Sequence, residues 1–373
     1  MANKKVLFII HRLYTGNLPK RGGIDHIVAF LSRNNKITLI EHPFDKINHL
    51  STLTACSYSK THKAVSRPPF LWFEEFLANI MWVRQTKEIF SLAVASDPLN
   101  FFSCFLLKKM KLVKATQFHS TDYSHPRFGN FLLEKIYQSL YRFALIHADK
   151  TTLVSPKMMR QAEQMVPDRF HRHFFLLPNS PEYNNIPKYP STEKNCYSLV
   201  MTAGIFKDQV DVDTLIDSLT RLKTHCPKAV LHIIGTVEKS TVDLFSENNL
   251  ENNLVFEGGL PYKQSIDEVA KSYIGITCYK KNSSYMSYAD SLKIREYAAA
   301  GLPIVCDNVY ATAEEVIKND AGFIYNSPAE MAEAIGRLIE NKKLYLAKSQ
   351  NAIAWAKKMD KIKWLKKLYD HFP

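Results

Sequence analysis

The sequence has few of the features that mark secreted, metal-stapled or membrane-spanning chains. Its six cysteines have no Cys-x-x-Cys spacing, which excludes a metal knuckle or a disulfide framework and favours a reducing compartment. The first apolar run, Val6–Ile10, is too short for a signal peptide or a membrane span and predicts a first strand. No helix-turn-helix or RNA-binding pattern is present, so we expect no nucleic-acid partner. These absences predict a cytoplasmic protein.

Acidic residues are also scarce relative to basic ones. Lysine and arginine number 49 and aspartate and glutamate 36, which gives a net charge of +13. Such a surface attracts anions, which include nucleic acid, phosphorylated small molecules and an anionic membrane, and charge alone does not choose among them. The chain is nevertheless globular in composition, with 46% hydrophobic residues, and its 373 residues suit two domains.

Strand-length apolar segments alternate with helical ones, which predicts an α/β fold with doubly wound sheets. The run 179–195 is rich in Pro, Asn, Ser and Lys and predicts a linker. We therefore predict domains at residues 1–185 and 186–350, followed by a helical tail at 351–373. The segment 46–67 has no clear period and predicts a surface excursion.

The stretch from Asp290 to Val305 predicts an anion-binding helix followed by a buried strand. Asp290 and Ser291 are suitable N-cap residues, and the first turn leaves backbone N–H groups to face an anion. Lys293 adds a cation, and Glu296 lies one turn further, where a carboxylate can accept two ribose hydroxyls. The alternative is an ordinary amphipathic helix before a core strand.

Two further segments carry candidate binding groups. Gly22 and Gly23 open a helix after the first strand, and glycine lets a ligand approach the backbone closely; a plain tight turn is the alternative. His119 and Asp122 follow a buried strand, at the sheet edge where α/β folds place ligands, and predict groups that orient hydroxyls or share a proton. A structural histidine is the alternative there.

Two helices leave a choice between protein core and membrane surface. The segment Pro69–Val83 is dense in aromatic residues and predicts either a core helix or a helix at a membrane interface. The basic tail from Lys342 predicts either packing on the protein, which we favour, or an interfacial membrane helix. Its apolar stripe comprises Trp355, Met359, Ile362, Leu365, Leu368 and Phe372.

The run Glu296–Val305, with Ala313–Ile317 and Ala321–Ile324, resembles the donor-nucleotide end of GT-B glycosyltransferases, in particular retaining family 4. The resemblance implies two Rossmann-like domains facing across a cleft, with the C-terminal helix crossing back to the N-terminal domain. It implies transfer of a sugar from a nucleotide diphosphate to a hydroxyl of a glycan or lipid-linked saccharide. That family often has a second glutamate where this chain has Tyr288.

The resemblance also implies roles for individual residues. His119, Asp122 and Lys207 are expected to be catalytic, and Arg127 and Tyr14 to lie on the acceptor side. The expected donor-binding residues are Gly22, Gly23, Gly204, Lys207, Gly235, Ser291, Leu292, Lys293, Glu296 and Glu315. We expect no cofactor and a UDP-sugar rather than a GDP-sugar as substrate.

A retaining, metal-independent reaction is what the resemblance implies. Asp211 and Asp213 have the spacing of an Asp-x-Asp metal motif, but they open a helix beside a diphosphate site supplied with lysines, so we expect no metal. Two rivals are a UDP-N-acetylglucosamine 2-epimerase-like enzyme and a non-catalytic protein that binds nucleotide-sugars or membrane surfaces. We expect a cytoplasmic enzyme, peripheral at the inner face of the membrane.

Overall fold

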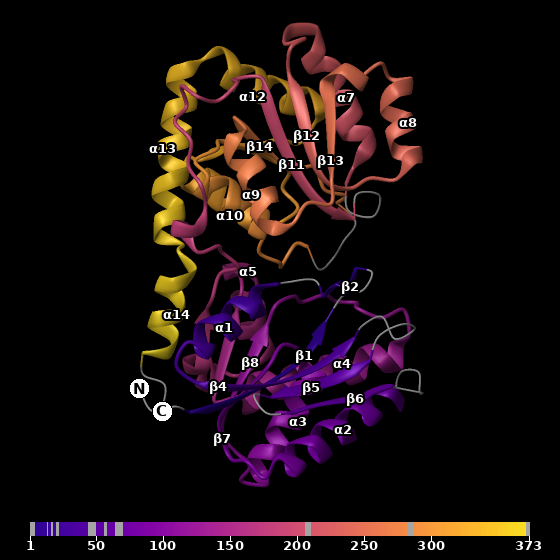
Figure 1. Cartoon of the computed structure of the whole chain (residues 1–373), viewed down its shortest axis with the longest axis vertical. Coiled ribbons are helices and arrows are strands. Elements are labelled where there is room, and N and C mark those ends of the chain that lie inside the picture. Colours follow the sequence, from indigo (N-terminus) through magenta and orange to yellow (C-terminus); the bar gives the residue numbers. More distant parts are fainter. Residues whose placement is uncertain are drawn as a thin grey trace. The chain divides into compact units, whose positions relative to one another are not determined.

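The structure is a computed structural model in which the chain divides into two compact units. The first comprises Met1–Pro178 with Trp364–Pro373, and the second Asn179–Lys363. Each unit has a central, mainly parallel sheet with helices packed on it (Figure 1), so the predicted α/β class with two doubly wound sheets is confirmed. The residues that the structure describes are 4–12, 14–15, 18–19, 22–43, 50–55, 58–63, 70–205, 210–281 and 286–370.

The sheet of the first unit has the spatial order β10-β9-β8-β7-β1-β4-β5-β6. The strands from β10 to β4 run parallel, whereas β5 and β6 join antiparallel at one edge. A separate two-stranded ribbon pairs β2 (Tyr14–Thr15) with β3 (Leu18–Pro19). The sheet strands are β1 (Lys5–Arg12), β4 (Lys36–Pro43), β5 (Ser51–Ala55), β6 (Tyr58–His62), β7 (Phe90–Ala95), β8 (Val113–Ser120), β9 (Lys150–Leu153) and β10 (Phe174–Leu176).

The prediction of a surface excursion at 46–67 was wrong, because this segment supplies β5 and β6. The side chains of Ser51 and Leu53 alternate inward and are buried, and β5 pairs with β4 through the backbone. Five-residue strands with mixed polar and apolar residues give only a weak periodic signal. Pairing with an existing sheet edge, rather than local pattern, decides their conformation.

Of the α-helices that lie between strands of the first unit, three follow parallel strands of its sheet, one follows the antiparallel strand β6 and one follows the two-stranded ribbon. Sequence signals explain most of their starts. Asp97, Asn130 and Ser155 each cap a helix by accepting hydrogen bonds from backbone N–H groups. Pro98 and Pro156 occupy first helical positions, where a missing N–H costs nothing. The helices are α1 (Gly23–Ser32), α2 (Phe70–Thr86), α3 (Pro98–Lys109), α4 (Phe131–His147) and α5 (Pro156–Met165).

The sheet of the second unit is parallel throughout, in the order β13-β12-β11-β14-β15-β16. One core cluster packs α7, α8 and α12 on one face, and another packs α9, α10 and α11 on the opposite face (Figure 1). Its strands are β11 (Ser198–Ile205), β12 (Val230–Thr236), β13 (Leu254–Gly258), β14 (Ile274–Ile276), β15 (Ile304–Cys306) and β16 (Gly322–Ile324). Its helices are α7 (Val212–His225), α8 (Lys239–Glu247), α9 (Tyr262–Lys271), α10 (Leu292–Ala299), α11 (Thr312–Lys318), α12 (Pro328–Glu340) and α13 (Lys342–Lys358).

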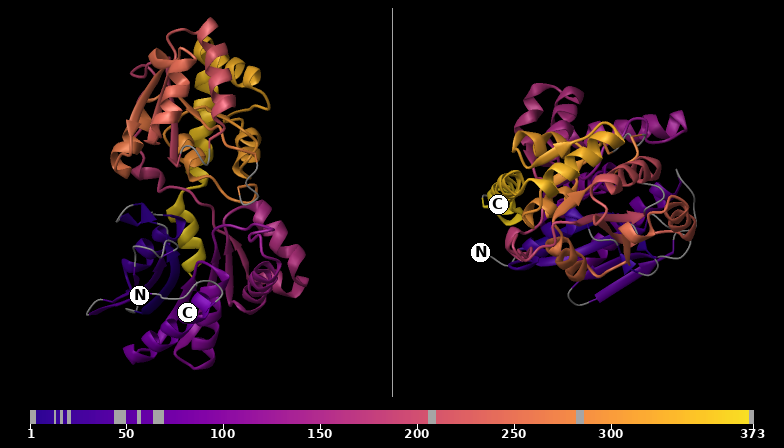
Figure 2. Two further views of the ribbon diagram at one scale, coloured as in Figure 1. Left: turned by 90° about the vertical axis from the view of Figure 1, so that its right-hand side faces the viewer. Right: turned by 90° about the horizontal axis from the view of Figure 1, so that it is seen from above.

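The tail packs on the protein, as we favoured from the sequence. Helix α14 (Lys361–Tyr369) lies against the indigo and magenta segments of the first unit (Figure 2), where Leu365, Leu368 and Tyr369 join the core cluster that contains Val6. The returning C-terminal helix of the predicted fold class is thereby confirmed. Phe372 lies outside the described residues.

The structural division differs from the predicted boundaries at both ends of the second domain. Residues 179–185 belong to the second unit, where the Asn179 N–H donates to the Asp290 carboxylate at 2.7 Å. Residues 351–363 also belong to it, because Ala352 and Trp355 of α13 are buried in the same cluster as Ile294 of α10. The composition of the linker predicted roughly where the second domain begins, but not the residue at which it begins.

Candidate functional site

The end of α10 that begins at Leu292 lies at the point where the strand order of the second sheet reverses. From β11 the chain proceeds to β12 and β13 on one side, and β14 to β16 lie on the other. In open α/β sheets, ligands bind at the carboxyl ends of strands at such a point. Gly204 lies near the end of β11, α10 follows β14, and the Tyr297 hydroxyl of α10 accepts from the Thr202 N–H of β11 at 2.8 Å.

Helix α10 begins with its N-terminal backbone groups at this edge. Ser291 is the N-cap residue, and its Oγ accepts from the Ile294 N–H at 3.4 Å. Leu292 is the first helical residue, so its N–H belongs to the unsatisfied first turn that attracts anions. The Lys293 Nζ lies 5.2 Å from the centroid of the Tyr279 ring. The structure therefore brings the predicted residues 291–293 together on one helical turn.

Glu296 lies one turn into α10 and is 6% exposed. The Tyr262 hydroxyl, from the first position of α9, donates to Glu296 Oε1 at 2.9 Å. Burial raises the pKa of Glu296 to about 7, although the Tyr262 hydrogen bond and the charge of Lys293 lower it. A carboxylate in this position is a strong acceptor for hydroxyl groups once it is ionised.

Glu315, another predicted donor-binding residue, belongs to a different cluster. Its carboxylate accepts from Arg295 Nη2 at 2.8 Å and from Trp355 Nε1 at 3.3 Å. Arg295 is 2% exposed and also pairs with the Asp290 carboxylate at 2.8 Å. The Glu315 side chain therefore balances a buried guanidinium within the second unit.

Gly235, predicted as a donor-site glycine at the end of β12, has a structural role that the sequence did not reveal. Gly235 has φ +147°, and a Cβ at this position would lie 1.6 Å from the Ala203 carbonyl oxygen. Only glycine allows this close approach between the two backbones. Lys207 lies outside the described residues, as does the side chain of Tyr14, whose backbone forms part of β2.

In the first unit, the predicted glycine pair starts α1. Gly22 is the N-cap and Gly23 the first helical residue. The Gly22 N–H donates to Asp25 Oδ2 at 2.6 Å, and Arg12 Nη1 holds the same carboxylate at 2.8 Å. Arg12 Nε also donates to Glu41 at 2.6 Å. The N–H of Gly22 is thus already occupied by a carboxylate of its own helix.

The predicted residues on β8 and the loop after it separate into two groups. His119 is fully buried, and its Nδ1 lies 2.9 Å from the Thr152 hydroxyl. Asp122 and Arg127 form a two-pronged ion pair at 3.1 and 3.2 Å on the loop beyond the strand. The Asp122–Arg127 pair thus lies beyond the carboxyl end of β8, whereas the His119 side chain lies in the interior of the first unit.

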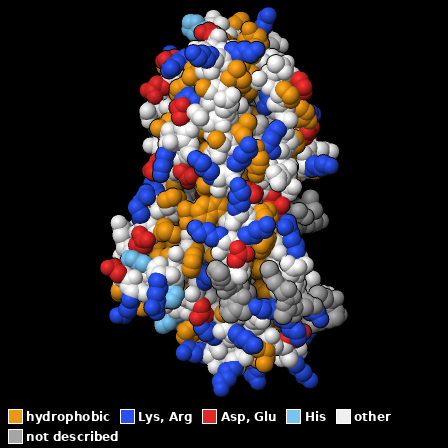
Figure 3. Space-filling view, turned by 90° about the vertical axis from the view of Figure 1, so that its left-hand side faces the viewer, with side chains coloured by type: hydrophobic (Ala, Val, Ile, Leu, Met, Phe, Trp, Pro, Cys, Tyr) orange, Lys and Arg blue, Asp and Glu red, His pale blue; other side chains and the backbone are white. Residues whose placement is uncertain are grey.

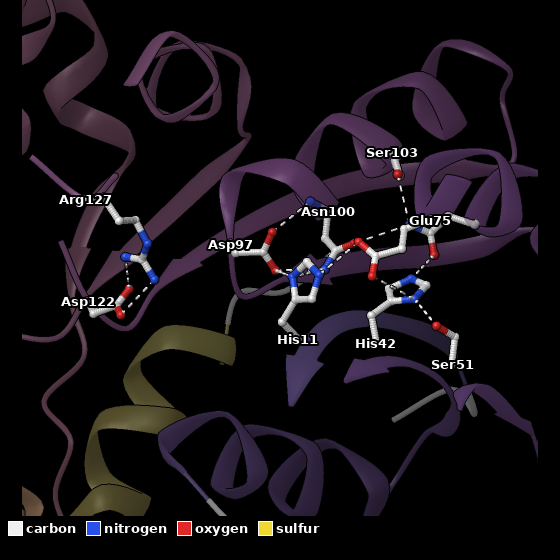
Figure 4. Close-up of polar contacts among 10 residues, drawn as sticks. His11, His42, Ser51, Glu75, Asp97, Asn100, Ser103, Asp122 and Arg127 are labelled. Carbon is white, nitrogen blue, oxygen red and sulfur yellow. Dashed lines mark hydrogen bonds and ion pairs between the residues drawn. The ribbon is translucent and has the colours of Figure 1, made fainter. Parts of the chain in front are cut away.

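A buried polar cluster occupies the point where the strand order of the first sheet reverses, between β1 and β7 (Figure 4). His11, at the end of β1, contacts Asp97 through Nδ1 at 2.9 Å and Glu75 through Nε2 at 3.1 Å. Burial alone would lower the pKa of His11, but Asp97 and Glu75 raise it to about 10. Two carboxylates therefore hold His11 as an imidazolium.

A second histidine extends this cluster toward the antiparallel edge of the sheet. His42 lies 2.9 Å from both the Ser51 hydroxyl and the Asn79 side-chain oxygen. Burial lowers the pKa of His42 to about 4, so it stays neutral beside the charged His11. Asn79 in turn donates to Asn100 at 3.2 Å. These side chains form one continuous network from β7 to β5 (Figure 4).

Sequence reasoning missed the His11 cluster and Tyr262. The only available signal was positional, since His11 ends the first strand and Asp97 precedes a Pro98 helix start. Glu75 comes from a helix with no charge pattern that indicates a partner. Among the described residues, no group of three or more histidine, cysteine or acidic side chains is arranged to hold a metal ion.

Comparison with known proteins finds a family model that matches most of the second unit. Residues 188–355 match the model of glycosyl transferases group 1. The match covers less than half of the whole chain. Glucosyltransferase 3 of Streptococcus gordonii is 21% identical over 213 residues, which span 52% of this chain and 63% of that protein. The chain therefore matches less than two thirds of the length of this curated relative.

Solved structures agree with the family on the fold. Anabaena HepE in complex with UDP is 13% identical and superposes with a TM-score of 0.69 over 98% of each chain. TarM of S. aureus in complex with fondaparinux, alpha-GlcNAc-glycerol and UDP is 14% identical, with a TM-score of 0.62 over 87% of this chain and 62% of that one. The chain thus has the GT-B fold, and the matched glycosyl transferases group 1 domain contains α10 with Lys293 and Glu296.

The imidazolium of His11 predicts how stability depends on pH. Its pKa rises from 6.5 in the unfolded chain to about 10 in the folded one, so the folded state binds the extra proton between these values. The stabilisation is complete below pH 6.5 and is lost as pH rises through 10. In urea unfolding, we expect the free energy of unfolding to fall more steeply over this range for the parent than for His11→Gln.

The matched control is His232→Gln, which removes a histidine–glutamate pair at 2.9 Å whose side chains are 28% and 25% exposed. Solvent screens such a pair, so this variant keeps the slope of the parent. Equal slopes for the parent and His11→Gln would show that His11 is not held as an imidazolium.

Proposed function

We propose that the chain is a glycosyltransferase that moves a sugar from a nucleotide diphosphate to a hydroxyl of a glycan or lipid-linked saccharide. The observation that carries this proposal is the start of α10 at the reversal point of the second sheet, with Lys293 and Glu296 on its first turns. The leaving nucleoside diphosphate gains negative charge as the glycosidic bond breaks. Backbone N–H groups and a lysine at a helix start stabilise that charge.

The donor in this proposal is a UDP-sugar, and the transferred group is a hexose or an N-acetylhexosamine. The support is that the structures of HepE and TarM contain UDP and that one of them also contains saccharides. The stereochemical outcome that we propose is retention. Nucleotide release discriminates the rivals: a transferase releases UDP when acceptor is present, an epimerase interconverts the sugar, and a binding protein does neither.

The first test removes the proposed ribose ligand. Because a hydrogen bond to a charged group contributes about 1.5–3 kcal/mol, we expect Glu296→Ala to weaken UDP binding about 10- to 150-fold in calorimetric titration. Glu314→Ala, which removes an exposed carboxylate from α11, should bind like the parent. Both variants should unfold cooperatively in urea, which shows that each is folded. Tight UDP binding by a folded Glu296→Ala protein contradicts the assignment.

The second test concerns metal ions. We propose that Lys293, with Lys207, compensates the charge of the leaving diphosphate, so that no divalent cation is required. UDP release from the donor should therefore continue in excess EDTA, and Lys293→Gln should slow it in the presence and absence of magnesium alike. Loss of activity in EDTA and its return with magnesium or manganese would refute this mechanism.

We further propose that the enzyme works at the inner face of a membrane. Helix α2 buries Leu71, Trp82 and Val83 but leaves an apolar stripe exposed on its other side. The stripe comprises Phe70, Phe73, Leu77 and Met81, which are 75%, 61%, 49% and 51% exposed. Among the described residues, no helix is both long and apolar enough to cross a bilayer. The exposed stripe instead has the character of a helix that lies in the interface.

The basic charge does not form one compact patch on the face drawn in Figure 3. Lysine and arginine side chains are scattered over that face, with fewer acidic ones between them. Each lysine close to an anionic membrane contributes about 1 kcal/mol to the free energy of binding. Scattered lysines therefore hold the protein at a membrane only when several of them contact it at once. The α2 stripe, which ends near the exposed Arg84, supplies the apolar part of the proposed contact.

Vesicle sedimentation tests this location. We expect binding to anionic but not neutral liposomes, weakened by salt because the Debye length is about 10 Å at 0.1 M and shorter above it. Phe73→Ser with Leu77→Ser should reduce binding at every salt concentration. Leu244→Ser, an exposed leucine of α8 with 43% exposure, is the matched control and should bind like the parent. Equal, negligible binding to both kinds of liposome would remove the membrane from the proposal.

A further inference from the structure

Tyr262 lies beside the proposed ribose ligand, although no sequence motif pointed to it. It is the first residue of α9 and follows the glycine turn Gly258–Gly259 at the end of β13. The residue is 53% exposed, yet its hydroxyl reaches inward to Glu296 Oε1 at 2.9 Å. An exposed ring thus covers a buried carboxylate and supplies it with one hydrogen-bond donor.

The Glu296 carboxylate depends on this donor. Among the described residues, no hydrogen bond other than that from Tyr262 reaches it. Its 6% exposure leaves little water to solvate a charge, and a buried carboxylate without partners tends to be protonated. A protonated carboxyl group has lost part of its acceptor capacity, so it no longer suits a pair of hydroxyl donors. The Tyr262 hydroxyl donates to Oε1 only, so the acceptor capacity of Oε2 is not used by this contact.

The surroundings supply few other charges. Lys293 acts on Glu296 from the same helix, and Glu182, which precedes the turn Tyr183–Asn185, acts on Tyr262. Helix α13 packs against α10, but its Trp355 ring contacts Arg295 instead of Glu296. The Arg295 Cζ lies 5.4 Å from the centroid of the Trp355 ring. The strands β14 and β15 under α10 contribute apolar residues and Cys306. The Tyr262 hydroxyl is thus the one neutral donor fixed on the carboxylate within the described chain.

We propose that Tyr262 is a positioning residue that orients the Glu296 carboxylate and favours its ionised form through this hydrogen bond, so that the carboxylate accepts the ribose hydroxyls of a nucleoside diphosphate. This inference rests on the proposed function. Burial and the adjacent carboxylate raise the pKa of the Tyr262 hydroxyl itself, so the hydroxyl remains a donor near neutral pH. Its role is to act through Glu296 rather than on the sugar.

The test is the pH profile of UDP binding. Since Glu296 has a pKa of about 7, the affinity of the parent for UDP should rise as pH increases through 7. In Tyr262→Phe, the lost hydrogen bond raises the pKa of Glu296, so the rise should move to higher pH. A pKa of Glu296 that is one unit higher lowers the affinity of Tyr262→Phe for UDP about tenfold near neutral pH. Above the new pKa, the affinities of the variant and the parent should approach each other again.

Two variants separate this effect from others. Glu296→Gln reports the pH dependence that comes from UDP itself, whose terminal phosphate titrates near pH 6. In a similar contact, the Tyr189 hydroxyl donates to the carboxylate of Asp267, a residue of α9, at 2.7 Å. Tyr189→Phe removes this hydrogen bond and should keep the pH profile of the parent.

Each outcome has one meaning. A displaced profile in Tyr262→Phe alone supports the inference, whereas a profile that coincides with that of the parent overturns it even if melting temperature falls. A uniform loss of affinity at all pH values also overturns it, because it indicates a direct contact or a purely structural role. A folded parent that binds no UDP at any pH overturns the proposed function and this inference together.

Discussion

The site in the second unit depends on one buried charge, the carboxylate of Asp290. It is shielded completely from solvent and pairs with Arg295 at 2.8 Å. It also accepts from the Thr312 hydroxyl at 2.6 Å and from the Asn179 N–H at 2.7 Å. A buried charge is tolerated only when partners surround it, so these groups must assemble together. The start of α10, the start of α11 and the entry of the linker are consequently fixed relative to one another.

The two sheets use their reversal points in different ways. In the first unit, His11, Glu75 and Asp97 fill this point with fully paired charges, and Asp25 occupies the Gly22 N–H. In the second unit, Glu296 has one neutral donor. Displacing a buried ion pair costs more than adding a hydroxyl to a carboxylate that retains acceptor capacity. This difference supports the proposal that places the nucleotide on the second unit.

The local motifs were predictable from sequence, and the long-range pairings were not. The start of α10 and the cap at Asp97 depend on residues within one or two turns, so their signals are contiguous. Asp290 looked like an N-cap, but Ser291 has that position and Asp290 pairs with residues far along the chain. The Tyr262–Glu296 contact likewise joins two helices. Such contacts exist only after the sheet has ordered its strands, and no pattern along the chain encodes them.

The basic net charge and the specific site act at different ranges. The arginines described at the two edges are engaged: Arg12 with Asp25, Arg127 with Asp122 and Arg295 with Asp290. The excess charge of +13 therefore attracts anions mainly through surface lysines, and salt screens that attraction beyond about 10 Å at 0.1 M. Attraction of this kind raises the rate of encounter for any phosphorylated molecule. In the proposed function, discrimination among those molecules comes from short, directional groups such as the first-turn N–H groups of α10 and the Glu296 carboxylate, because hydrogen bonds depend on the geometry of the ligand.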